Sequence, residues 1–207
     1  MDKLEKLLEF VIPYYENDDP SHDMSHVRRV LRTCEVIGKE LKANLDLLLP
    51  AAILHDIVNV PKNSPNRSKA SELAANKAKT ILKQFDYTDE KCLKIHQIII
   101  EHSFSKGLSP SSLESKILQD SDKLDAIGAI GILRVSTCGT KMKAKYYNEN
   151  DPWAKDRAYD DKKYSLDHFY TKLLKLPELM NTSIGREMAS ERVKFMQKFL
   201  DQLAQEI

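Results

Sequence analysis

The sequence predicts a single all-α domain, residues 1–207, folded as a bundle of about seven to eight helices. Apolar residues recur three and four positions apart along most of the 207-residue chain, the spacing that places them on one helix face. No stretch alternates convincingly between apolar and polar residues, as a half-buried strand would. Breaks rich in proline and polar residues separate the helical patterns, and a chain of this length can bury a sizeable core.

The first three helical patterns lie within residues 1–58. An amphipathic pattern ends at Tyr15, and a second runs from 27 to 41. Residues 45–58 are apolar on nearly every side, which indicates a buried central helix, and Pro50 is tolerated there if it lies in the first turn. The apolar stripe of the first helix consists of Leu4, Leu7, Leu8, Val11, Ile12 and Tyr15.

The remaining patterns predict helices over 69–85, 89–103, 112–135, 164–176 and 182–206. The core of the domain, with any functional site, is expected within about 20–135, and the last two helices, over about 164–206, close the bundle. Loops are expected at the intervening breaks, of which the longest spans residues 138–164. A loop of that length is often functional, and whether it closes over a substrate is left open.

The charge balance excludes some classes of partner. Basic residues number 32 and acidic residues 31, and this balance gives no support for binding a nucleic acid polymer or a membrane surface. The beginning of the chain, "MDKLEKLLEFVIPYY", lacks the long apolar run of a signal peptide or membrane anchor. The three cysteines have no metal-like spacing and are expected as reduced thiols. These features favour a cytoplasmic protein and leave the oligomeric state open.

Two His-Asp pairs occur, and their surroundings differ. His55 and Asp56 follow "AAIL" at the end of the buried helix, where an ionisable pair is costly unless it is paired or metal-bound. His22 and Asp23 lie in the polar segment "NDDPSHDMSH", where Asp23 could cap a helix. His26 comes in the first turn of the second helix and can face inward.

A carboxylate cluster follows in "KILQDSDKLDAIGAIGILRV", residues 116–135. On a helix, Asp122 and Asp125 share a face with Leu118 and Ala129, and buried aspartates are rarely unpaired. A cation is a suitable partner for them. His26, His55, Asp56 and Asp122 therefore form a plausible imidazole–carboxylate site for a divalent metal ion such as Mn, Mg, Ni, Co, Fe or Zn.

These four residues resemble the H…HD…D signature of the HD-domain metal-dependent phosphohydrolases. The segments "AAILHDIVNVPKNSPNRSKAS", "HSFS", "QDSDKLDAIGAIGILR" and "LDHFYTKLLKLP" resemble its bacterial YedJ-like branch, over roughly residues 18–200. The resemblance implies an all-helical fold with the metal between helices and with His26, His55, Asp56 and Asp122 as its ligands. Ser121 stands where the family usually has a small alanine, a difference that should not harm the site.

Other residues are candidates to support this site. Asp56 could take a proton from the attacking water, and Asp23 could orient His26. Asp125 has no fixed role in the family and is a candidate to contact a ligand. His102 lies at a helix end on the face that also carries Ile99; it could be a core histidine, a phosphate donor, a general acid or a ligand to a second metal.

Basic residues could clamp a phosphate. Lys62 and Arg67 lie in the loop after the His55–Asp56 pair, and Lys172 shares a helix face with His168; a solvated charge is the alternative at each. Three other side chains have weaker claims on the site: His22 is more consistent with a position before the helix than with a ligand, His96 with a structural role, and Trp153 could stack on a base or pin its loop.

The resemblance, together with these metal-binding residues, implies metal-assisted hydrolysis of a phosphate ester or anhydride, and a nucleotide is the leading expectation for the small phosphorylated substrate. The metal would lower the pKa of a water molecule from about 15.7 toward ~7. The alternatives are a di-iron oxygenase with the same fold, a non-catalytic domain that senses a metal or nucleotide, and a hydrolase of signalling nucleotides that carry two pyrophosphate groups.

Overall fold

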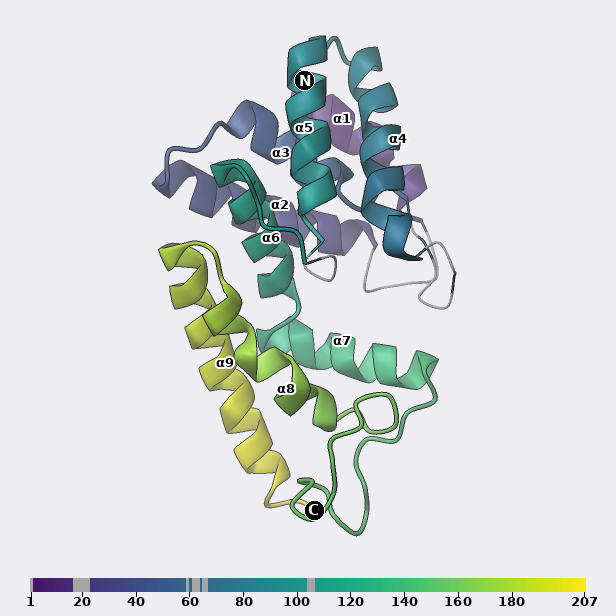
Figure 1. Cartoon of the computed structure of the whole chain (residues 1–207), viewed down its shortest axis with the longest axis vertical. Coiled ribbons are helices and arrows are strands. Elements are labelled where there is room, and N and C mark those ends of the chain that lie inside the picture. Colours follow the sequence, from purple (N-terminus) through teal and green to yellow (C-terminus); the bar gives the residue numbers. More distant parts are fainter. Residues whose placement is uncertain (1, 17–22, 59, 61–63, 65–66, 104–106) are drawn as a thin grey trace. The chain divides into compact units, whose positions relative to one another are not determined.

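The prediction of an all-α fold is confirmed by a computed structural model, which describes residues 2–16, 23–58, 60, 64, 67–103 and 107–207 (Figure 1). These residues form nine α helices and short 3-10 turns, and no strand longer than an isolated bridge occurs among them. The chain divides into two compact units, residues 1–122 and 123–207, with the boundary inside helix α6. The expectation of a single domain stays a prediction, and the units are described separately.

Five helices and most of a sixth make up the first unit. α2 packs on α3, α3 packs on α5, and α4 and α5 lie side by side as an antiparallel pair (Figure 1). His96 of α5 and Asn76 of α4 link these two helices by a hydrogen bond, with Nε2 and Oδ1 3.0 Å apart. The helices are α1 (Lys3–Val11), α2 (Met24–Glu40), α3 (Leu45–Leu54), α4 (Ala70–Gln84), α5 (Asp89–Glu101) and α6 (Leu113–Asp125).

The ends of three helices matter for the site. α2, α3 and α5 each begin at a capping residue, whose side chain accepts a hydrogen bond from a backbone N–H of the first turn. The capping residues are Asp23, Asn44 and Thr88. α3 ends at Leu54, four residues before the predicted end at 58, so the His55–Asp56 pair follows the helix. Pro50 lies in the second turn of α3, one turn further in than the position at which it is best tolerated.

The second unit contains α7 (Gly128–Lys141), α8 (Asp167–Thr171), a 3-10 segment (Leu173–Leu179) and α9 (Ser183–Leu203). α9 packs against α7 and against the 3-10 segment. The predicted helix 112–135 is wrong: it is divided into α6 and α7 at Gly128, whose φ of +80° suits glycine. A side chain there would also meet the Arg192 side chain at 3.2 Å.

Residues 138–141 belong to α7, so the long loop begins at 142 instead of 138. It is organised around the buried carboxylate of Asp167. The Arg157 guanidinium donates to both oxygens of Asp167 at 2.6 and 2.8 Å, and the Asp160 N–H donates at 2.7 Å. Burial raises the pKa of Asp167, but these hydrogen bonds outweigh burial and hold the pKa below its usual value.

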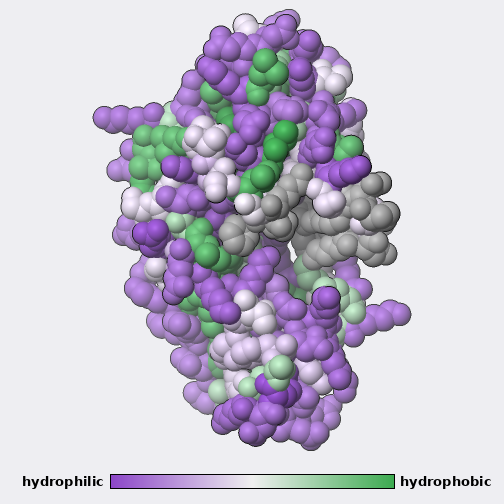
Figure 2. Space-filling view, viewed as in Figure 1, coloured by the Kyte–Doolittle hydropathy of each residue, from purple (hydrophilic) through white to green (hydrophobic). Residues whose placement is uncertain are grey.

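Among the described residues, no helix combines the length and apolar character needed to cross a membrane. The face in Figure 2 is largely hydrophilic, with hydrophobic side chains in scattered groups. Scattered apolar side chains of this kind are normal on protein surfaces.

Replacing Arg157 with alanine should destabilise the protein by about 3 kcal/mol at pH 7, because Asp167 is then a buried carboxylate without its cation. The folded-state pKa of Asp167 is lowered, so the stability it contributes is present above the unfolded pKa of about 3.9 and is lost as the pH falls through the folded pKa. Denaturant unfolding at pH 7 and pH 3 should show the difference between wild type and variant shrinking in acid.

The matched control is Lys194→Ala, which removes an exposed ion pair with Glu191 in the same unit. It should change the free energy of unfolding by less than about 0.5 kcal/mol. An Arg157→Ala variant as stable as Lys194→Ala at pH 7 would contradict the structural role of the Arg157–Asp167 pair.

Candidate metal centre

His26 lies in the first turn of α2. The Asp23 carboxylate caps that helix, accepting the His26 N–H at 2.9 Å and the Ser25 hydroxyl at 2.6 Å. Asp23 therefore positions His26 through its backbone. The His26 side chain is fully buried.

His55 lies just beyond the end of α3 and is also fully buried. Its Nδ1 is 2.8 Å from the Ala52 carbonyl oxygen, which can only accept, so Nδ1 carries the proton. The lone pair of Nε2 is then available to the site. Burial lowers the pKa of His55 to about 4, which keeps the imidazole neutral, the form that binds metals.

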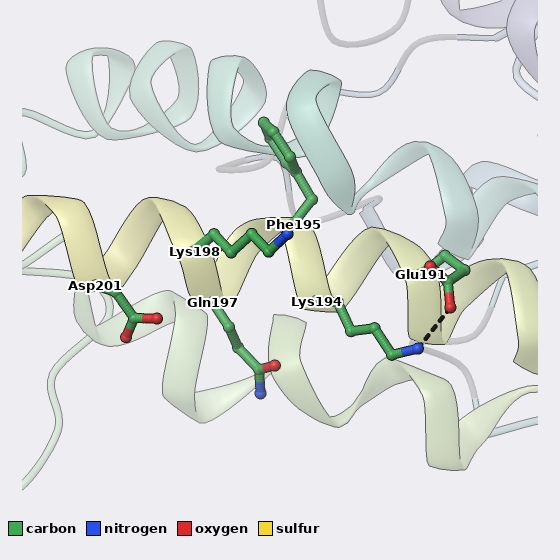
Figure 3. A pocket seen from close by; sticks show the side chains of 6 residues that line it. All are labelled: Glu191, Lys194, Phe195, Gln197, Lys198 and Asp201. Atoms are coloured by element: carbon green, nitrogen blue, oxygen red, sulfur yellow. Dashed lines mark hydrogen bonds and ion pairs between the residues drawn. The ribbon is translucent and has the colours of Figure 1, made fainter.

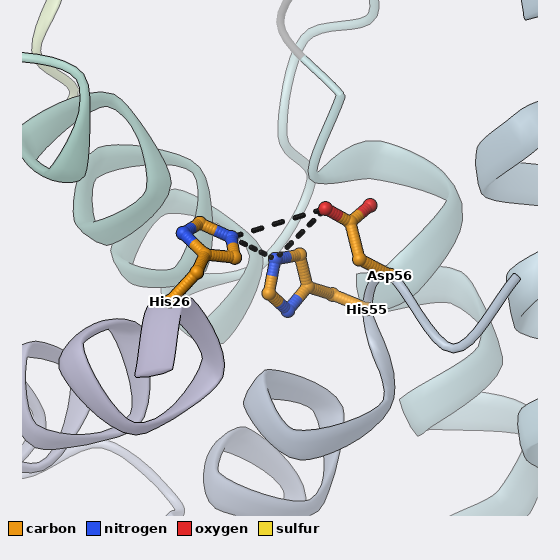
Figure 4. Close-up of side chains that lie close together, drawn as sticks. All are labelled: His26, His55 and Asp56. Atoms are coloured by element: carbon orange, nitrogen blue, oxygen red, sulfur yellow. Dashed lines mark hydrogen bonds and ion pairs between the residues drawn. The ribbon is translucent and has the colours of Figure 1, made fainter. Parts of the chain in front are cut away.

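His26, His55 and Asp56 converge on one point (Figure 4). The two Nε2 atoms are 3.2 Å apart, and Asp56 Oδ2 lies 3.6 Å from His55 Nε2 and 3.8 Å from His26 Nε2. Two nitrogens bound to one cation at about 2.0–2.1 Å would be separated by about 3.0–3.4 Å, depending on the coordination geometry. The donor set and its spacing therefore fit a divalent cation.

Asp122 of α6 reaches the same cluster. Its Oδ1 lies 3.7 Å from His26 Nε2, and the side chain is 31% exposed. Burial raises the pKa of Asp122, but the neighbouring His26 and His55 outweigh it and lower the pKa. The structure thus brings all four residues of the predicted ligand set together.

His102, just beyond the end of α5, faces the other oxygen of Asp56. Its Nε2 is 3.7 Å from Asp56 Oδ1, and its ring lies edge-on to His55 with centroids 5.1 Å apart. The Ile99 carbonyl accepts from Nδ1 at 2.6 Å. Burial works to lower the pKa of His102, but the carboxylates of Asp56 and Asp122 raise it overall. His102 is therefore buried and also faces the cluster.

Other expected residues are described within their own units. Asp125 forms an ion pair with Arg134 at 2.5 Å in the second unit. Lys172 is exposed in that unit, and His168 there pairs with Asp161 at 3.0 Å. His96 bonds to Asn76, as a structural histidine would. Trp153 packs edge-on against Tyr170, with centroids 6.4 Å apart.

Two predicted phosphate contacts fall where side chains are not described. Lys62 lies outside the described residues, as does His22. Arg67 begins a 3-10 turn, Arg67–Lys69, that leads into α4. The roles of Lys62, Arg67 and Lys172 stay predictions.

Tyr15 is a residue that sequence reasoning assigned only to an apolar stripe. It is 2% exposed, and its hydroxyl donates to the Ile53 carbonyl at 2.7 Å, two residues before His55. A buried tyrosine needs a partner for its hydroxyl, and this requirement is the signal that could have singled it out.

A shallow depression lies along α9, lined by residues of that helix alone (Figure 3). It combines exposed charged side chains with half-exposed Phe195, and Lys194 pairs with Glu191 at 2.6 Å. It carries no buried titratable cluster. The lining residues are Glu191, Lys194, Phe195, Gln197, Lys198 and Asp201.

The chain is similar to known proteins over nearly its whole length. The uncharacterized protein YpgQ of Bacillus subtilis (strain 168) is 33% identical over 98% of this chain and 93% of its own length. A crystal structure of YpgQ in complex with ADP has a TM-score of 0.76 and 29% identity, covering 99% of this chain and 95% of that one.

Two further solved structures carry a hydrolase name. An HD-superfamily hydrolase from Bacillus thuringiensis is 31% identical with a TM-score of 0.76, covering 99% of this chain and 96% of that one. A predicted HD superfamily hydrolase from an uncultured Thermotogales bacterium is 27% identical with a TM-score of 0.66, covering 98% of this chain and 92% of that one.

The family model described as HD domain matches residues 24–127, the range that contains the four clustered residues and His102. With this match and with similarity along nearly its full length, the chain belongs to the HD-domain family.

Proposed function

We propose that this protein is a metal-dependent phosphohydrolase that cleaves a phosphate ester or anhydride bond of a nucleotide. The observation that carries the proposal is the convergence of two buried imidazole nitrogens, 3.2 Å apart, with the carboxylates of Asp56 and Asp122. Such a donor set suits a divalent cation, and the proposed ligands are His26, His55, Asp56 and Asp122. When bound, the cation supplies Lewis-acid chemistry and makes a water molecule easier to deprotonate.

The chain's own residues provide charge balance and proton transfer. The buried imidazoles are expected to bind in their neutral form, so Asp56 and Asp122 offset the two positive charges of the cation. Asp56 is also proposed to accept a proton from the attacking water, since one of its oxygens faces away from His26 and His55 toward His102.

His102 is proposed to act on the substrate. Its Nδ1–H is committed to the Ile99 carbonyl, and its Nε2 points to the Asp56 carboxylate at 3.7 Å. A proton on Nε2 would give a donor beside the reacting phosphate, where it could neutralise charge on a phosphoryl oxygen or on the leaving group. A ligand role for His102 toward a second metal is the competing assignment.

The ADP complex of YpgQ supports a nucleotide as the substrate class. Phosphate groups carry negative charge that basic side chains can neutralise, and Lys62, Arg67 and Lys172 remain the proposed contacts. Identifying the product formed from each nucleotide shows whether the enzyme releases phosphate or pyrophosphate.

Asp56→Asn should abolish turnover, because the amide loses the charge that binds the cation and the base that accepts a proton. Purified protein, treated with chelator and resupplied with Mn, Mg, Ni, Co or Zn in turn, should release phosphate or pyrophosphate from a nucleotide panel only with metal. In Asp56→Asn, kcat/KM should fall by at least about 10²-fold relative to the wild type.

Asp46→Asn is the matched control, because Asp46 is an exposed carboxylate in the same unit that pairs with Lys91 at 2.9 Å. It should keep wild-type activity. A wild-type protein that binds metal but turns over no nucleotide would replace the hydrolase proposal with a sensor of metal or nucleotide.

His102→Gln should separate the two assignments of His102. As a proton donor, His102 is replaceable without loss of the cation, so kcat should fall about 10²-fold while the affinity for Mn²⁺ stays within a few-fold. Titration calorimetry with Mn²⁺ and steady-state kinetics measure the two quantities.

His96→Gln is the control, because His96 bonds to Asn76 on the neighbouring helix and does not contact the cluster. Its kinetics should match wild type. Loss of one bound Mn²⁺ per chain in His102→Gln would contradict the proton-donor role and assign His102 as a metal ligand.

A further inference from the structure

The end of α3 is held by unusual partners. A helix leaves the carbonyls of its last turn without helical N–H donors. In α3 the Ala52 carbonyl accepts from the His55 ring at 2.8 Å, and the Leu54 carbonyl accepts from the Ile57 N–H at 3.2 Å. The Ile53 carbonyl accepts instead from the Tyr15 hydroxyl at 2.7 Å, across 38 positions of sequence.

The same hydroxyl bonds to the chain just before the two proposed ligands. Ile53 precedes His55 by two residues and Asp56 by three, and its carbonyl accepts from the Tyr15 hydroxyl at 2.7 Å. A tyrosine hydroxyl carries one proton to donate, and here the Ile53 carbonyl accepts it. One hydroxyl thus links the turn after α1 to the last turn of α3, which the His55–Asp56 pair follows.

Tyr15 is itself firmly held. The ring is 2% exposed, and its N–H donates to the Ile12 carbonyl at 3.0 Å, which closes the 3-10 turn after α1. Leu7 and Val11 of α1 are fully buried, and α1 packs against α3. Both the backbone and the ring of Tyr15 are therefore held, the first by the turn and the second by burial.

The backbone that Tyr15 fixes controls several distances at once. Asp56 Oδ2 lies 3.6 Å from His55 Nε2 and 3.8 Å from His26 Nε2. Asp56 Oδ1 lies 3.7 Å from His102 Nε2. Because these contacts point in different directions, a small rotation of the Asp56 backbone would change all of them. Ligand placement is sensitive to such changes, and partners that orient ligands typically contribute about 10- to 100-fold to metal affinity.

We infer that Tyr15 is a positioning residue of the metal centre: its hydroxyl binds the Ile53 carbonyl at the end of α3 and so holds the His55–Asp56 pair, which follows directly, in the geometry that binds a cation. This inference rests on the proposed role of His55 and Asp56 as metal ligands. It gives the turn after α1, which contributes no proposed ligand, a function in the site.

The test is Tyr15→Phe, which keeps the aromatic ring and removes only the hydroxyl. Mn²⁺ affinity is measured by titration, and Co²⁺ is added alone to record the visible absorption of the bound ion. The variant should bind Mn²⁺ about 10- to 100-fold more weakly. Its Co²⁺ spectrum should differ from that of wild type, because the ligands are no longer held in the same geometry.

Tyr164→Phe is the matched control. Tyr164 is also buried, and its hydroxyl also forms one hydrogen bond, in which it accepts from the Asn148 amide at 3.0 Å in the second unit. Thermal unfolding of both variants shows how much each lost hydrogen bond affects stability. All titrations are run well below the melting temperatures, so a purely structural effect leaves the affinity of the folded protein unchanged.

Wild-type Mn²⁺ affinity and an unchanged Co²⁺ spectrum in Tyr15→Phe would overturn the inference while leaving the metal site intact. The absence of metal binding by the wild-type protein would overturn the proposed function instead, so the two failures are distinguishable. A change in Tyr164→Phe equal to that in Tyr15→Phe would also contradict a specific role for Tyr15.

Discussion

The close approach of two buried imidazole nitrogens is the constraint on which the site depends. His26 and His55 place their Nε2 atoms 3.2 Å apart with no exposure of either side chain. Since the Ala52 carbonyl keeps the proton of His55 on Nδ1, the His55 lone pair faces its neighbour. His26 can meet this lone pair in two ways: it can donate a proton from Nε2, or it can bind the same cation as His55. The adjacent carboxylates of Asp56 and Asp122 favour a cation, and the proposed chemistry follows from that preference.

The helices of the first unit place the three histidines of the site at their ends. His26 lies in the first turn of α2, while His55 and His102 lie just past the ends of α3 and α5. Residues at helix ends can be fixed by caps, as Asp23 does for His26, and by hydrogen bonds to free carbonyls, as Tyr15 does at Ile53. In the second unit, a different buried charge is satisfied, because Arg157 neutralises Asp167 and orders the long loop. The second unit thus stabilises its buried carboxylate with a cation from its own chain.

The all-α class and the four clustered residues could be predicted from the sequence, because helical periodicity is strong and because buried His and Asp residues demand a partner. The break at Gly128 could not, since the apolar pattern continues across it and only the positive φ marks the division between α6 and α7. Tyr15 was missed for a related reason: its ring satisfies the apolar stripe, and the partner of its hydroxyl comes from a helix 38 positions away. Long-range hydrogen bonds of this kind leave no local pattern in a sequence.

The most direct test of the metal centre is a crystal structure of the protein with Mn²⁺, using anomalous diffraction collected at the manganese absorption edge. The expected result is one strong peak within bonding distance of the Nε2 atoms of His26 and His55 and of carboxylate oxygens from Asp56 and Asp122. A peak bound elsewhere, with the two imidazoles still 3.2 Å apart and empty between them, would contradict the account.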